Sequence, residues 1–134
     1  MAALLIAGCG DSPPAAVEDA VVRLPVIQDR PGVAYFTLRA NRLPMRILGV
    51  SSPQIQRIEL HDSTMAGNVM RMGPLLDRDL APDGEKTFAP GGPHAMLFGI
   101  DPSVRPGGTV SLTFDFDNAP DVTVDAPVAA LVGN

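Results

Sequence analysis

The sequence predicts an all-β fold, a Greek-key barrel or sandwich that forms a single domain. Fourteen prolines and thirteen glycines divide the 134 residues into short segments, which favours strands and turns over long helices. About eight of these segments have the apolar runs or the alternation of strands, and none has the pattern of an amphipathic helix. The chain is also long enough to bury a real hydrophobic core in one domain.

Composition restricts both the core and the class of partner. Hydrophobic residues make up 46% of the chain but aromatic residues only 4%, and tryptophan is absent, so we expect a core built mostly from Val, Leu, Ile and Ala. The formal net charge is -5 and the isoelectric point is about 4.7. Proteins that bind nucleic acid use a cationic surface to displace counterions. We therefore do not expect nucleic acid as a partner.

The first half of the chain contains a series of short expected strands, each bounded by turn residues. In the strand that begins at Val33, the residues Ala34, Phe36 and Leu38 share the face that we expect to be buried. Polar and small residues from Asp62 to Asn68 predict a loop. The expected strands are Val17 to Leu24, Val33 to Leu38, Arg46 to Val50, and Gln54 to Leu60, which His61 closes.

The second half contains the clearest strand pattern. From Thr109 to Asp117, apolar residues alternate with polar ones, and Val122 to Val124 is expected to pair back with this strand as a hairpin. In the strand that begins at His94, a period of two places His94 and Met96 on one face. The expected strands are Val69 to Met72, Lys86 to Phe88, His94 to Phe98, Thr109 to Asp117 and Val122 to Val124.

The ends of the chain lie outside the expected β domain, which we place at residues 21–126. The segment Leu4 to Ser12 around the single cysteine, Cys9, resembles a bacterial lipobox, in which the cysteine is lipidated and becomes the mature N-terminus. Gly10 to Val17 suits a flexible tether. We interpret residues 1–20 as a signal remnant and tether, and residues 127–134 as a C-terminal tail. A chance cysteine after an apolar stretch is the alternative.

The segment from His61 to Met96 carries the residues with metal chemistry. It is bounded by the only two histidines of the chain and contains four of its six methionines. Imidazole nitrogen and thioether sulfur together are ligands for a soft metal, and Cu(I) fits them best. Zn²⁺, Ca²⁺ and Mg²⁺ prefer ligands that this set lacks. Because the segment has no cysteine, a blue-copper electron-transfer centre is not expected.

Structural roles are the alternative for the same residues. Methionines fill irregular gaps in cores, and for Met70 we expect core packing rather than a place as an auxiliary sulfur beside the metal. Met65 lies in the expected polar loop, where proximity to the metal and a purely structural role both stay open. A histidine that closes a strand is commonly a surface residue. No nucleophile with a histidine partner can be assembled, so we do not expect an enzyme.

Four short motifs in this region stand at a fixed spacing: a histidine, ten residues, a methionine, twenty-one residues and His-x-Met. They are Glu59-Leu60-His61, Val69-Met70-Arg71-Met72, Ala89-Pro90-Gly91-Gly92 and His94-Ala95-Met96. The pattern resembles the signature of the periplasmic copper chaperones of the PCuAC family, and the resemblance extends from about Val21 to Val124. It implies a cupredoxin-like β barrel that binds one Cu(I) at an exposed site through His61, Met72, His94 and Met96. We expect this site where the ends of three strands meet.

The resemblance also implies partners and a compartment. The implied recipient of the copper is the binuclear centre of cytochrome c oxidase, in its subunit II, or the copper assembly factor of that centre. We expect a monomer in the periplasm, attached to the membrane only through a lipid on Cys9. Two other functions stay open: a periplasmic copper buffer or resistance protein with the same site, and a non-metal β-sandwich interaction module of the cell envelope.

Overall fold

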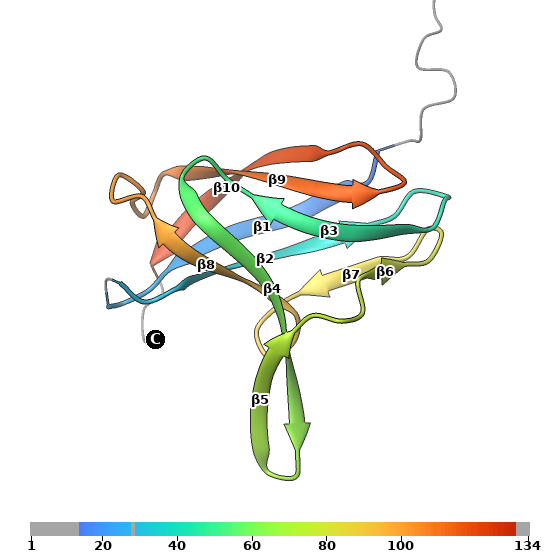
Figure 1. The fold of residues 1–134 in the computed structure, drawn as a ribbon. Helices are drawn as coiled ribbons and strands as arrows, with labels where there is room; N and C mark the ends of the chain where they lie inside the picture. The colour runs from blue at the N-terminus through green and yellow to red at the C-terminus, as the bar shows by residue number, and fades with distance from the viewer. Residues whose placement is uncertain (1–13, 28, 131–134) are drawn as a thin grey trace, which may run out of the picture.

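The computed structural model describes residues 14–27 and 29–130, and in these ranges the protein is entirely β (Figure 1). The described part of the chain contains no helix able to span a membrane. The strands are β1 (Ala16–Leu24), β2 (Gly32–Arg39), β3 (Met45–Ser51), β4 (Ile55–Ala66), β5 (Val69–Pro74), β6 (Asp79–Leu80), β7 (Glu85–Phe88), β8 (His94–Ile100), β9 (Thr109–Asp117) and β10 (Val122–Ala130).

These strands form one sheet that curls around a single core without closing. Their order is β5-β4-β8-β2-β1-β10-β9-β3-β6. One edge of β2 is shared by two strands: β8 pairs with its residues 32–34 and β7 with its residues 36–39. The neighbours are antiparallel except β1 and β10, which pair in parallel and align Val22 with Val128. The predicted hairpin of β9 and β10 is present, with Val122 opposite Phe114. The all-β prediction is confirmed.

Phe36 of β2 lies at the centre of the core. Its ring stacks on Phe88 of β7 with centroids 4.4 Å apart, and meets Phe114 of β9 edge-on at 4.7 Å. Such aromatic pairs contribute roughly 0.5–1.5 kcal/mol beyond the area that they bury. Ala34, Phe36 and Leu38 are all buried, as their alternation predicts. Most other core residues are aliphatic, in agreement with the composition.

The strand β4 is longer than predicted. It continues to Ala66, turns through Gly67 and Asn68, and returns as β5, with Ala66 opposite Val69. Gly67 has a φ of 67°, which is typical of the first central residue of a two-residue type II′ turn. The predicted loop from Asp62 to Asn68 is therefore wrong. This hairpin extends beyond the body of the sheet (Figure 1), so both of its faces accept polar residues that otherwise indicate a loop.

The bounds at the two ends also differ from the predicted ones. β10 continues past residue 126, where we expected a tail, to Ala130, because Val128 pairs with β1 and is buried. β1 begins at Ala16, inside the segment that we expected to be a tether. The lipobox-like segment around Cys9 lies outside the described residues.

Candidate metal centre

Three neighbouring strands carry the predicted ligands on one face. β4 lies between β5 and β8, and His61 of β4 is directly opposite His94 of β8. Met96 pairs with Glu59, and Met72 pairs with Ser63. Because side chains alternate along a strand and directly opposite residues share a face, both methionines lie on the face of His61. Each is a diagonal neighbour of His61, a relation with a typical separation of about 7–8 Å that long side chains can span.

The two imidazole rings lie near one another. Their centroids are 5.9 Å apart and their planes are inclined by 59°. A metal–imidazole bond is about 2.0–2.1 Å long and a ring nitrogen lies about 1.1 Å from the ring centroid, so two rings that share a metal have centroids at most about 6.4 Å apart. The separation of His61 and His94 is within that limit. The two rings are therefore close enough to share a single ion.

His94 is buried, and one of its ring nitrogens has no partner. Nδ1 lies 2.8 Å from the carbonyl oxygen of Gly92, which can only accept a hydrogen bond, so Nδ1 carries the proton and Nε2 keeps the lone pair in the neutral ring. Nε2 is buried and has no hydrogen-bond partner among the described residues. A buried polar atom without a partner costs about 1–3 kcal/mol. Histidine ligands commonly donate their other N–H to a backbone carbonyl, so this arrangement fits a metal ligand.

The turn before β8 fixes the orientation of this ring. Gly92 N donates to Ala89 O over 3.0 Å, and Gly91 has a φ of 84°. Proline in the second position and a residue of positive φ in the third are typical of a type II turn, which explains Pro90 and Gly91. The turn ends with the Gly92 carbonyl two residues before His94. The proline and glycine motif thus holds the acceptor for Nδ1.

Glu59, which we did not predict as part of the site, forms a hydrogen bond with the second histidine. Its Oε1 accepts a hydrogen bond from Nε2 of His61 over 3.0 Å, which leaves the lone pair of the neutral ring on Nδ1. The hydrogen bond from His61, followed by that from Arg57, lowers the pKa of the Glu59 carboxyl below its usual value. Arg57 also lies 4.4 Å from the ring centroid of Phe98. A Glu-x-His pattern on a strand places both side chains on one face and is the signal that indicates such a pair.

The four predicted ligands differ in their exposure. His94 is 5% exposed, the His61 side chain 23%, and Met72 62%, while Met96 is partly buried. Only His94 lies at a strand end, since His61 is inside β4 and Met72 inside β5, so the predicted meeting of strand ends is wrong. The protruding hairpin is the reason, because it carries β4 and β5 past the ligands. The role of these residues as ligands stays a prediction.

The remaining methionines of this segment are placed differently from our expectations. Met65 lies in β4, not in a loop, and is 62% exposed. Met70 is 53% exposed, so the expected core packing of this side chain is wrong. Within the described residues, no group of three or more His, Cys, Asp or Glu side chains is placed to hold a metal ion.

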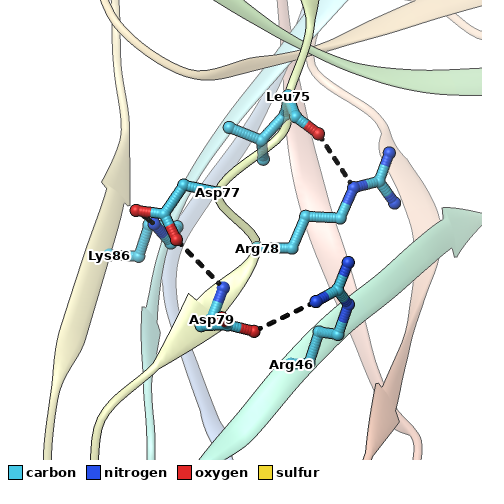
Figure 2. A network of polar contacts seen from close by, with 6 residues as sticks. All are labelled: Arg46, Leu75, Asp77, Arg78, Asp79 and Lys86. Atoms are coloured by element: carbon cyan, nitrogen blue, oxygen red, sulfur yellow. Dashed lines mark hydrogen bonds and ion pairs between the residues drawn. The ribbon is translucent and has the colours of Figure 1, made fainter.

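A polar network fixes the base of the hairpin to the body of the sheet. Arg78 donates from Nε to Leu75 O over 3.0 Å and from a terminal nitrogen to Leu48 O of β3 over 2.9 Å. Figure 2 shows the first of these bonds beside the ion pair of Arg46 and Asp79, which joins β3 to β6 at 3.3 Å. Leu75 is buried and donates its N–H to Leu60 O over 2.9 Å. Leu60, which precedes His61, is therefore linked to a segment that Arg78 connects to β3.

A family model matches most of the chain, and solved structures share its fold. The model of the family described as "Putative lipoprotein LpqE-like" matches residues 15–128. The copper-bound PCuAC domain from PmoF2 is similar in structure, with a TM-score of 0.71 and 25% identity over 89% of this chain and 95% of that chain. The Cu(I) form of DR1885 from Deinococcus radiodurans has a TM-score of 0.65 and 26% identity over 94% of this chain and 85% of that chain.

A third similar structure, the apo PCuAC domain from PmoF1, has a TM-score of 0.71 and 21% identity over 90% of this chain and 97% of that chain, and it supports the fold alone. No curated protein sequence matches the chain. These likenesses confirm the predicted cupredoxin-like fold and the resemblance to PCuAC domains.

Proposed function

Since the chain belongs to the LpqE-like family and has the fold of PCuAC domains, we propose that it is a Cu(I)-binding chaperone of the cell envelope. The proposed ligands are His61, Met72, His94 and Met96. Two similar proteins, the PmoF2 domain and DR1885, are solved with copper bound, and DR1885 with Cu(I). Thioether and neutral imidazole ligands suit this ion, because both are uncharged and sulfur is soft.

The observation that carries the proposal is the buried, unpaired Nε2 of His94. Its lone pair lies in a ring that already donates from Nδ1 and that lies 5.9 Å from the ring of His61. A metal ion between the rings gives this buried nitrogen a partner and so removes the free-energy cost of leaving it unpaired. A purely structural histidine in a β core normally has both nitrogens paired or one of them in water.

The graded exposure of the ligands supports a carrier rather than a permanent metal site or an enzyme. His94 is nearly inaccessible, whereas Met72 projects from the exposed hairpin. A recipient protein can therefore offer its own ligand on the side of Met72 while His94 still holds the ion. Without a thiolate in the set, the copper is also bound less tightly and can be released.

A chelator competition tests the proposed site. Under anaerobic conditions, bicinchoninic acid competes for Cu(I) with the wild type and with His61→Ala, Met72→Leu, His94→Ala and Met96→Leu. We expect one tight equivalent for the wild type and its loss in His94→Ala and in the double variant His94→Ala/Met96→Leu. Met45→Leu is the matched control, because Met45 is buried in the core at 4% exposure. This variant should bind Cu(I) as the wild type does. Unchanged tight binding in the double variant contradicts the proposal.

We propose the binuclear copper centre in subunit II of cytochrome c oxidase, or its copper assembly factor, as the recipient. The resemblance to PCuAC chaperones supports this choice. A deletion strain should contain oxidase deficient in this centre, and added copper should restore it. Loss of copper tolerance with normal oxidase loading indicates a buffer or resistance protein instead. A melting temperature that does not respond to Cu(I) indicates an interaction module that binds no metal.

The proposed location is the periplasm, with a lipid on Cys9 that anchors the chain to the membrane. The description of the family as lipoproteins supports this proposal. A Cys9→Ser variant should move from the membrane fraction to the soluble periplasmic fraction. If both forms fractionate identically, Cys9 carries no anchor.

A further inference from the structure

The hairpin of β4 and β5 exposes sulfur along one face. Met65, Met70 and Met72 are 62%, 53% and 62% exposed, and none of them belongs to the hydrophobic core. The pair between these positions, Thr64 and Arg71, lies on the opposite face of the hairpin. The three thioethers thus stabilise no packed interior. Core packing does not explain why methionine occupies all three positions.

The register places these sulfurs within reach of one ion. Leu75 N bonds to Leu60 O, so this pair is hydrogen-bonded, and the alternation along an antiparallel ladder makes Met65 and Met70 a non-hydrogen-bonded pair. Residues in such pairs have Cα atoms only about 4.5 Å apart, and their side chains are closest. Met72 is a diagonal neighbour of Met65, a relation that long side chains span. Three flexible thioethers therefore share one face of the hairpin at separations that their side chains can span.

We propose that Met65, Met70 and Met72 form a second Cu(I) site, weaker than the first, through which copper enters or leaves the protein. The inference rests on the proposed function, since it assumes that Cu(I) is the cargo. The ligand set is all thioether, which selects Cu(I) over divalent metals. Its exposure at the edge of the sheet leaves it open to a donor or acceptor.

Met72 connects the two sites. Its partner on β4, Ser63, lies two residues from Met65 in one direction and two residues from His61 in the other, and two residues along a strand span about 6.8 Å. During transfer, the bonds of copper to the sulfurs of Met65 and Met70 break while bonds to His61, His94 and Met96 form. Met72 keeps its bond throughout. The ion stays Cu(I), so no electron or proton donor is required.

The test uses Cu(I) alone as the probe and substitutions that remove sulfur but keep apolar bulk. Cu(I) is titrated anaerobically into the full chain with ¹³C-labelled methionine methyl groups and into the variant Met65→Leu/Met70→Leu. For the wild type we expect one tight equivalent, which occupies Met72, and a weaker second equivalent held by Met65 and Met70, whose methyl signals shift during this second step. The double variant should bind one equivalent with unchanged affinity and load more slowly from a chelator. Thr64→Leu/Arg71→Leu, on the other face of the hairpin, is the control and should behave as the wild type.

Failure of this site and failure of the first site give different results. In a His94→Leu/Met96→Leu variant, the tight equivalent should disappear while Met65 and Met70 still shift with added Cu(I). If the wild type binds one equivalent and these two methyl groups never shift, the second site does not exist. If Cu(I) shifts no methionine and binds nowhere, the proposed function itself is wrong. If the leucine variant loads at the wild-type rate, the hairpin contributes only an apolar surface, and the inference is overturned.

Discussion

Replacement of His94 by leucine should destroy copper binding and yet leave the metal-free protein as stable as the wild type or more stable. In the metal-free state, His94 buries Nε2 without a partner while Nδ1 donates to Gly92 O. Removal of the unpaired nitrogen should stabilise the fold by about 1–3 kcal/mol, and loss of the Nδ1 bond should destabilise it by about 0.5–1.5 kcal/mol. Leucine has a similar volume and adds no polar atom.

The net change in the free energy of unfolding of the metal-free protein therefore lies between a loss of about 0.5 and a gain of about 2.5 kcal/mol, with a gain of about 1 kcal/mol at the midpoints. For a domain of this size each kcal/mol corresponds to a rise in the melting temperature of about 3–5 °C. Urea unfolding, with and without Cu(I) buffered by a chelator, measures both quantities. The wild type should gain stability with copper, by about 2.7 kcal/mol when free Cu(I) exceeds the dissociation constant a hundredfold, and the variant should gain none.

His61→Leu is the matched control. Nε2 of His61 already bonds to Glu59 and its side chain is 23% exposed, so leucine removes a bond without relieving an unpaired nitrogen. This variant should also lose copper affinity, but its metal-free form should not gain stability. A loss of 1 kcal/mol or more in metal-free His94→Leu shows that His94 is an ordinary, satisfied core residue and refutes the reasoning.

Two other substitutions test the surroundings of the site, and a third tests an acidic pair at the hairpin of β9 and β10. Glu59→Gln should reduce Cu(I) affinity by about 10–100-fold in the chelator competition, because the partner that orients His61 is weakened. The pKa of Glu59 is lowered in the folded state, so its stabilising effect should be complete at neutral pH and should decline in pH-dependent melts as the pH falls below about 4.3, the pKa of an unperturbed Glu. Arg78→Ala should destabilise the protein by about 1–3 kcal/mol in urea unfolding, because two backbone carbonyls lose a charged donor, and Arg78→Lys should recover only part of this loss. Desolvation and the neighbouring Asp121 raise the pKa of Asp115. The folded state therefore binds the proton of Asp115 more tightly than the unfolded state, and the stabilisation from this proton is lost as the pH rises. Asp115→Asn should raise the melting temperature by about 1–2 °C at pH 7 and not at pH 3. Equal shifts at both pH values contradict the last prediction.

The strands of the body were predictable because each buries one face. In β9 the alternation of Val110, Leu112, Phe114 and Phe116 with polar residues gave the bounds of the strand as the structure has them. The hairpin was not predictable in this way, because no core covers either of its faces and its composition carries no periodic signal. The turn residues Gly67 and Asn68 were the only local indication of a hairpin. The exposed hairpin is therefore where the loop at Asp62 to Asn68 and the core role of Met70 were predicted incorrectly.

The sequence by itself determined the chemistry of the proposed site, since two histidines and the methionines at their spacing supply imidazole nitrogen and thioether sulfur, a soft donor set. Only the tertiary structure decided which atoms are available. The register of β4 and β8 brought His61 opposite His94, and the turn before β8 left Nε2 of His94 buried and unpaired. The contact of Glu59 with His61 and the shared face of the exposed methionines likewise depend on which strands pair and on how far those strands extend. Register and burial arise from contacts between residues far apart in the chain, so local patterns do not contain them.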